Sequence, residues 1–106
     1  LKTKGKIDRD FQIGMSIQSI DAGIMRYYDL KSNKGVIITK VLPNTPSDIA
    51  GLKSGDIIIE IDGYKISNEQ TIFGVFQEFR AGQEIEVKII RDNSELTKIM
   101  KLERNK

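Results

Sequence analysis

The sequence predicts a small α+β domain that is mainly β, with an antiparallel sheet of five or six strands, one long helix and one or two short helices. Three observations indicate this fold class. Apolar and polar residues alternate in several short runs, as they do in half-buried strands. Turn-forming residues separate these runs. One longer stretch has helical spacing, and the whole chain of 106 residues has the length of a single domain.

The first ordered segment is expected at residues 11–18, after a polar and charged linker at residues 1–10. Apolar side chains occupy every second position of this segment, which is typical of a half-buried strand: Phe11, Ile13, Met15 and Ile17. Between Ile20 and Leu30 the apolar positions fall three or four residues apart. This spacing predicts a short helix with Asp21 as its N-cap.

A turn is expected at residues 31–35, followed by a strand rich in β-branched residues at 36–42. The next residues carry three helix-start signals. They are an N-cap side chain, a proline at the first helical position and an acidic residue in the first turn, namely Thr45, Pro46 and Asp48. Gly51 ends this helix after about one turn, because glycine is favoured just past a helix C-terminus.

Residues 57–61 are almost entirely apolar, which predicts a strand that is buried on both faces. We therefore expect Ile58 and Ile61 to lie in the core. The Asp62–Gly63 pair is a strong signal for a tight turn, and it predicts a hairpin that returns through residues 64–66.

The main helix is expected at residues 67–80, opened by a capping box of Ser67 and Gln70 and ended at Gly82. Its apolar stripe is too wide for one core-facing seam, since neighbouring residues on a helix diverge by about 100°. Some of its apolar side chains must therefore face a groove. Two further strands complete the expected sheet, at residues 84–91 and 96–102.

Composition excludes several classes of function. The net charge of +2, from 17 basic and 15 acidic residues, produces no field that would attract nucleic acid or an anionic membrane. No apolar run reaches the ~20 residues that span a bilayer, so no direct membrane insertion is expected. The chain has neither histidine nor cysteine, which removes the commonest general base and the usual zinc ligands. We expect no catalysis, no metal and no cofactor, and a monomer.

Four segments occur in an order and spacing that carry a family resemblance. They are residues 13–18, residues 35–46, the run A-G-L-K-S-G-D-I-I at residues 50–58, and the helix that opens at Ile66–Ser67. Together they resemble the permuted PDZ domain of bacterial HtrA (Deg) serine proteases, and the third segment is the most specific match. The first segment is similar to the carboxylate-binding loop of that family and the strand after it, and the second to its next strand and turn. The resemblance covers residues 11–103 and leaves 104–106 as a tail.

This resemblance implies a PDZ-like, partly open antiparallel barrel or sandwich. It also implies a non-catalytic module that captures hydrophobic C-terminal peptide ends by adding them as a strand. The carboxylate-binding loop would be Ile13, Gly14 and Met15. Pairing with the peptide strand would involve Ser16, Ile17 and Gln18. The hydrophobic pocket and groove helix would contribute Asn68, Ile72, Val75 and Phe76.

Gly14 has a physical reason to be glycine in such a loop. Consecutive backbone N–H groups can form a concave nest for an anion, and the turn that makes the nest strains any residue with a Cβ. Ile13, Met15 and Ile17 would then form the floor of the pocket for the last ligand side chain, with the helix as its other wall.

A second function stays open from the sequence. The domain could be a docking or allosteric module of its parent protease, or a part of a secretion or membrane-protease component, that binds no free peptide. The expected partners are therefore C-terminal or unfolded polypeptide segments, together with the parent protease domain. The chain begins at Leu1 rather than Met, which indicates a piece of a larger protein. An HtrA-like parent predicts a periplasmic, otherwise extracytoplasmic or membrane-anchored location.

Overall fold

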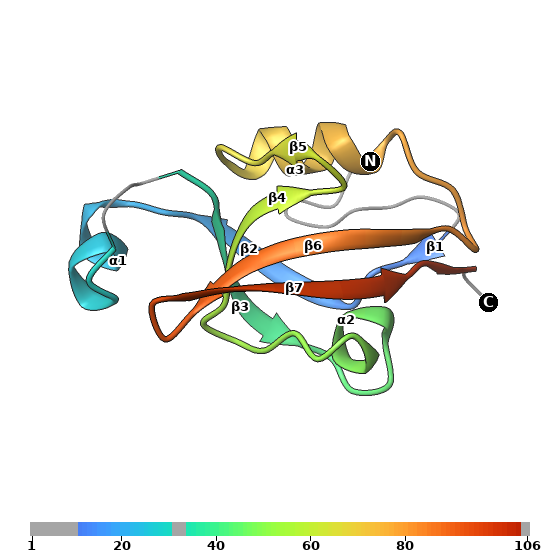
Figure 1. Ribbon diagram of the computed structural model, residues 1–106, viewed down its shortest axis with the longest axis horizontal. Helices are drawn as coiled ribbons and strands as arrows, with labels where there is room; N and C mark the ends of the chain where they lie inside the picture. Colours follow the sequence, from blue (N-terminus) through green and yellow to red (C-terminus); the bar gives the residue numbers. More distant parts are fainter. Residues whose placement is uncertain (1–10, 31–33, 105–106) are drawn as a thin grey trace, which may run out of the picture.

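The computed structural model describes residues 11–30 and 34–104, so the expected linker and most of the turn at 31–35 lie outside the described residues. Within this part of the chain, eight strands and three helices follow one another (Figure 1). They are β1 Phe11–Gln12, β2 Met15–Ser19, α1 Ala22–Tyr27, β3 Val36–Val41, α2 Pro46–Ile49, β4 Ile57–Ile61, β5 Tyr64–Lys65, α3 Glu69–Phe76, β6 Glu84–Arg91, β7 Ser94–Lys101 and β8 Glu103–Arg104.

The strands form a mainly antiparallel sheet that is not closed into a barrel. Its order is β2-β3-β4-β6-β7, and the short β5 pairs with β4. β6 and β7 form a long hairpin with Ile89 opposite Leu96 and Ile85 opposite Met100. The short strands β1 and β8 pair with each other in a separate two-stranded sheet, with Phe11 opposite Arg104. The fold class expected from the sequence is confirmed, and β2 lies at one end of the sheet.

Two apolar clusters lie on opposite faces of the sheet. Neighbouring strand residues point to opposite faces, so Ile38 and Ile58 enter the main core while Ile37 and Ile57 enter a smaller cluster. The main core also contains the buried side chains of α3, and the smaller cluster is covered by α1. Ile58 is fully buried, as Ile61 is, so the prediction of core positions in β4 is confirmed.

Local signals in the sequence identified two helix starts correctly and one incorrectly. Asp21 caps α1, and Thr45 caps α2 with Pro46 in the first turn, as predicted. The cap of α3 is Asn68 rather than Ser67, because the Asn68 side chain accepts the Thr71 N–H at 3.0 Å. The predicted capping box with Gln70 is therefore wrong.

The main helix is also shorter than its apolar stripe predicts. It ends at Phe76. The next residues continue in tight turns with hydrogen bonds from residue i to residue i−3, and the Phe79 N–H donates to the Phe76 carbonyl at 3.3 Å. Phe79 remains buried in these turns. The expected first strand is likewise interrupted, since Ile13 and Gly14 separate β1 from β2. The last long strand begins two residues earlier than predicted, at Ser94.

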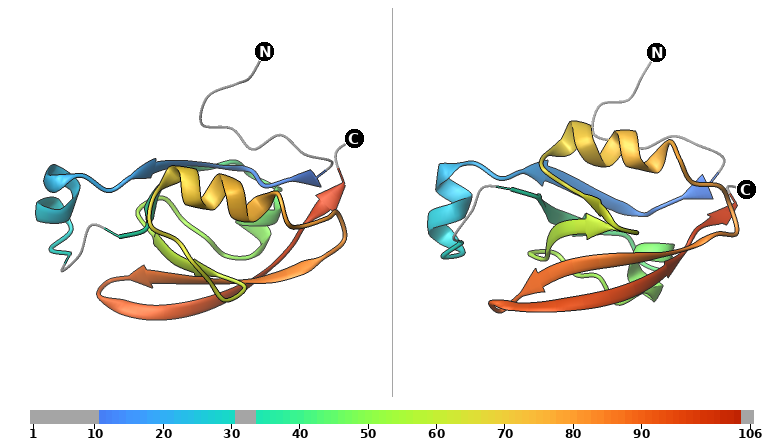
Figure 2. Two further views of the ribbon diagram at one scale, coloured as in Figure 1. Left: turned by 90° about the horizontal axis from the view of Figure 1, so that it is seen from above. Right: turned by 45° about the horizontal axis from the view of Figure 1, so that its top comes forward.

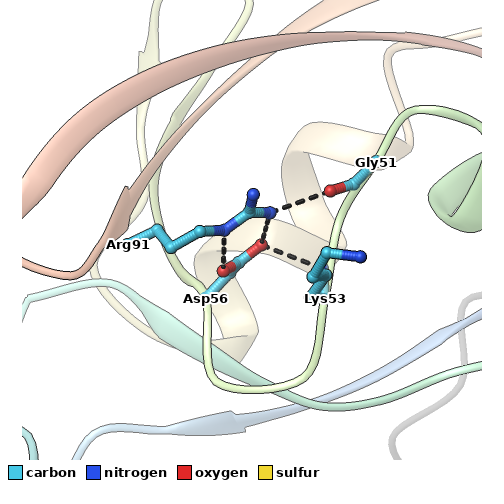
Figure 3. A network of polar contacts seen from close by, with 4 residues as sticks. All are labelled: Gly51, Lys53, Asp56 and Arg91. Atoms are coloured by element: carbon cyan, nitrogen blue, oxygen red, sulfur yellow. Dashed lines mark hydrogen bonds and ion pairs between the residues drawn. The ribbon is translucent and has the colours of Figure 1, made fainter.

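An ion pair joins the loop after α2 to the end of β6 (Figure 3). Arg91 donates from Nε to Asp56 Oδ1 at 2.9 Å and from Nη2 to Asp56 Oδ2 at 2.7 Å. Its Nη2 also donates to the Gly51 carbonyl at 2.8 Å, while the Lys53 N–H donates to Asp56 at 2.9 Å. The hydrogen bonds that Arg91 donates to Asp56 raise the pKa of Arg91 above its ordinary value, so the guanidinium stays protonated at neutral pH.

Candidate functional site

The open edge of β2 is the feature from which the candidate site is built. Within the described residues β2 pairs only with β3, so its second edge carries no strand. α3 runs alongside this edge and contacts β2 (Figure 2). An unpaired edge next to a helix is the arrangement that accepts an extended peptide as an added strand.

The turn that begins β2 requires glycine for two independent reasons. Gly14 has φ +87°, a conformation that side chains with a Cβ rarely adopt. A Cβ at this position would also overlap the side chain of Thr45, which lies directly against the Gly14 backbone. Thr45 is buried and is held by a hydrogen bond from its Oγ1 to the Leu42 carbonyl at 2.7 Å. The turn is therefore tightly packed against the N-terminus of α2.

Two carbonyl groups in this turn point into the protein. The Ile13 carbonyl accepts the Ser47 N–H at 3.0 Å and the Ser47 Oγ at 2.7 Å, and Ser47 is fully buried. The Gly14 carbonyl accepts the Leu42 N–H at 2.8 Å. In a trans peptide the N–H points opposite to the carbonyl before it. The N–H groups of Gly14 and Met15 therefore point away from these partners, where they can receive a carboxylate.

The hydrogen-bonding direction of β2 alternates from residue to residue, and the ladder shows which residues face the open edge. Ile38, which lies opposite Ile17, donates its N–H to Asp56 and accepts from Gly55, so its backbone groups point away from β2. Ile17 therefore belongs to a non-hydrogen-bonded pair and directs its own N–H and carbonyl to the open edge.

The same alternation assigns the neighbours of Ile17. Met15 and Ser19 also face the open edge, whereas Ser16 and Gln18 direct their backbone groups to β3. Of the three predicted pairing residues, only Ile17 therefore offers its backbone to a ligand. The sequence pattern indicated a strand but contained no signal for which edge each residue faces. Met15 and Ile17 are half-buried on the core side.

The helix side of the groove contains a residue that the sequence analysis missed. Ile72 and Phe76 have no exposed surface, and Val75 is 8% exposed, so all three are core residues in this structure. Phe73 is half-buried and lies one turn after Glu69, which contacts β2. Phe73 is therefore the accessible apolar side chain on the face of α3 toward β2.

Asn68 is placed differently from the other predicted groove residues. Its side chain caps α3 and is exposed, accepting hydrogen bonds from the N–H and the hydroxyl of Thr71 at 3.0 and 3.1 Å. Asn68 therefore has a structural role at the start of α3. Its hydrogen bonds to Thr71 occupy the side-chain oxygen that a ligand donor would use.

A cavity of about 490 Å³ lies elsewhere, on the face of the sheet covered by α1. It is lined by apolar and polar residues that include Leu30, Ile59 and Ile90. The described wall of this cavity contains no open strand edge, so it cannot bind a chain end by strand addition. Within the described residues, no group of three or more acidic side chains could hold a metal ion, and no helix is both long and apolar enough to cross a membrane.

Comparison with known proteins agrees with this geometry. A family model described as PDZ domain matches residues 12–102. The chain belongs to the PDZ domain family. The PDZ assignment expected from the sequence is thereby confirmed, and PDZ domains are non-catalytic modules.

Proteases of the HtrA type are among the relatives of this PDZ domain. It is 34% identical over 103 residues to a probable periplasmic serine endoprotease DegP-like of Marinomonas sp. (strain MWYL1), covering 97% of this chain and 22% of that protein. It is also 34% identical over 111 residues to the serine protease Do-like HtrA of Bacillus subtilis (strain 168), covering 97% and 24% respectively. The chain thus spans less than a quarter of the length of these two relatives.

Solved structures with a similar fold include two that contain a bound peptide. The HtrA-type protease AlgW with decapeptide superimposes with a TM-score of 0.81 at 18% identity, covering 92% of this chain and 30% of that one. The HtrA3 PDZ domain bound to the phage-derived ligand FGRWV gives a TM-score of 0.74 at 20% identity, covering 88% and 85%. At these identities the similarity establishes the fold alone.

Proposed function

We propose that this PDZ domain binds the C-terminal ends of polypeptides that finish in an apolar residue. The terminal carboxylate accepts the N–H groups of Gly14 and Met15. The ligand then runs antiparallel to β2 along the open edge and pairs with Ile17. Its last side chain enters the apolar space between Met15 on β2 and Phe73 on α3.

The orientation of the peptide groups around Gly14 is the observation that carries this proposal. Their carbonyls are held by Ser47 and Leu42, so the two N–H groups are fixed before any ligand arrives. Donors that are already oriented need no reorganisation when an anion binds, which favours binding. An internal peptide segment has no terminal carboxylate and would leave these donors without their charge-assisted acceptor.

The relatives support a place for this module in protein quality control. They are named as serine proteases, and several as periplasmic enzymes. We infer that the domain presents exposed polypeptide ends to an HtrA-type protease in an extracytoplasmic compartment, or senses them for it. The peptides named in the similar structures belong to those proteins and are consistent with this role.

An NMR titration with a short peptide that ends in an apolar residue tests the location of the site. A strand of about four residues loses conformational freedom on binding, so only moderate affinity is expected. We expect a micromolar dissociation constant, which corresponds to a binding free energy of about −8 kcal/mol. Shift changes should be largest at Ile13 to Ile17 and at Phe73. The cavity residues Leu30 and Ile90 are the internal control and should stay unshifted. Shifts confined to the cavity, or no binding by any such peptide, would favour the docking function instead.

A further inference from the structure

The far end of the β2 edge is closed by a reciprocal contact with α3. The Ser19 N–H donates to Glu69 Oε2 at 3.0 Å, and the Glu69 N–H donates to the Ser19 Oγ at 3.0 Å. Fifty residues separate the two partners, so this contact joins the strand to the helix. Both residues are half-buried.

Each half of this contact satisfies a backbone group that would otherwise lack a partner. Glu69 is the first residue of α3, and the N–H groups of a first helical turn have no partner within the helix. Ser19 belongs to the set of β2 residues whose N–H faces the open edge. The Glu69 carboxylate therefore occupies the position where a carbonyl of an added strand would lie.

The position of this carboxylate along the edge defines a ligand length, given the binding mode proposed above. If the last ligand residue lies opposite Met15, antiparallel pairing places the third residue from the end opposite Ile17. The fifth residue from the end then lies opposite Ser19. Its carbonyl and the Glu69 carboxylate compete for a single N–H donor, and the carboxylate makes the stronger, charge-assisted bond.

We propose that Glu69 is a specificity-determining residue that limits strand pairing to the last four residues of the ligand. The rest of the ligand leaves the groove past the N-terminus of α3 without pairing to β2. This inference rests on the proposed binding of chain ends. It adds to that function a limit on the number of ligand residues that pair with β2.

Affinity measurements with two nested peptides test this length limit. One peptide has four residues; the other has seven, with the same last four and an uncharged, acetylated extension. The native domain should bind both with dissociation constants within about twofold. In Glu69→Ala the Ser19 N–H is free to bond to the fifth residue from the end of the longer peptide. This peptide should then bind about fivefold more tightly than the shorter one, because one hydrogen bond contributes about 1 kcal/mol.

Two matched variants separate the hydrogen bond from the charge. Glu69→Gln keeps a side-chain oxygen for the Ser19 N–H but loses the charge that favours the carboxylate over a ligand carbonyl. The preference for the longer peptide should therefore lie between that of the native domain and that of Glu69→Ala. Glu78→Ala removes an exposed carboxylate outside α3 and should not change the ratio of the two affinities. A native domain that strongly prefers the longer peptide, or an unchanged ratio in Glu69→Ala, would overturn the proposal.

Amide hydrogen exchange on the free native domain tests the contact without any ligand. The Ser19 amide should exchange more slowly than the amides of Met15 and Ile17, because among the described residues Ser19 alone of these three has a partner at the open edge. Equal exchange at Ser19 and Ile17 would contradict the closed edge. If Ser19 is protected but neither peptide binds, the proposed function fails and the length limit fails with it, while the structural contact stands.

Discussion

Replacing Arg91 by alanine is expected to lower the free energy of unfolding by about 3 kcal/mol, a large part of the ~5–15 kcal/mol typical of a domain. The change leaves the Asp56 carboxylate, which is 2% exposed, without its bidentate partner. The Gly51 carbonyl loses a donor as well. Urea unfolding followed by circular dichroism measures this loss.

The ion pair is also expected to act on the binding site from a distance. Arg91 holds Gly51 at the end of α2, and the same short helix carries Ser47, which orients the Ile13 carbonyl. Arg91→Ala should therefore weaken peptide binding even at temperatures where the domain remains folded.

Asp56→Ala is the matched control for the Arg91 prediction. It leaves behind an Arg91 side chain that is 24% exposed and can be hydrated, so a smaller loss of about 1–2 kcal/mol is expected. The double variant should cost less than the sum of the two single changes, since the partners are coupled. Equal losses for the two single variants would show that burial of Asp56 does not govern the energetics of this pair.

Gly14→Ala is expected to reduce both stability and peptide binding. The positive φ alone costs about 1 kcal/mol for a residue with a Cβ, and the overlap with Thr45 adds the cost of an overpacked site, for a total of about 3 kcal/mol. Because the turn must shift to relieve the overlap, the N–H groups of Gly14 and Met15 lose their orientation. Peptide affinity should fall at least tenfold in the folded variant, as measured by calorimetry at low temperature.

Gly63→Ala separates the two causes of the Gly14 effect. Gly63 has φ +89°, close to that of Gly14, but a Cβ there would meet no atom within 4 Å. Only the conformational cost of about 1 kcal/mol is expected, with peptide binding unchanged. If Gly14→Ala were no more harmful than Gly63→Ala, the close packing against Thr45 would have no role in shaping the site.

Much of the fold was predictable because the decisive signals are local. The run at residues 57–61 has the apolar pattern of a doubly buried strand, and Thr45 with Pro46 specifies a helix start whatever surrounds it. The start of α3 was misplaced by one residue because Ser67 and Asn68 are both good caps. Only the backbone geometry, with Asn68 extended and its side chain turned to Thr71, distinguishes them.

The candidate site was predictable in outline, because its loop lies in one segment that resembles a known motif. Its finer properties depend on contacts between distant segments. Ser47 holds Ile13 from 34 residues away, and Glu69 holds Ser19 from 50. No periodicity in the sequence indicates contacts between residues that lie so far apart in the chain. The exposure of Phe73, in contrast with the complete burial of Ile72, likewise depends on how α3 is rotated against the sheet.

Comparing the acid and amide forms of one peptide tests the central claim most directly. Both forms have the same side chains and the same capacity for strand pairing, so they differ only at the group that the Gly14 turn would bind. We expect the amide to bind at least about tenfold more weakly, since a hydrogen bond to a charged group contributes about 1.5–3 kcal/mol. Equal affinity of the two forms, measured by calorimetry, would contradict the capture of chain ends by the N–H groups of Gly14 and Met15.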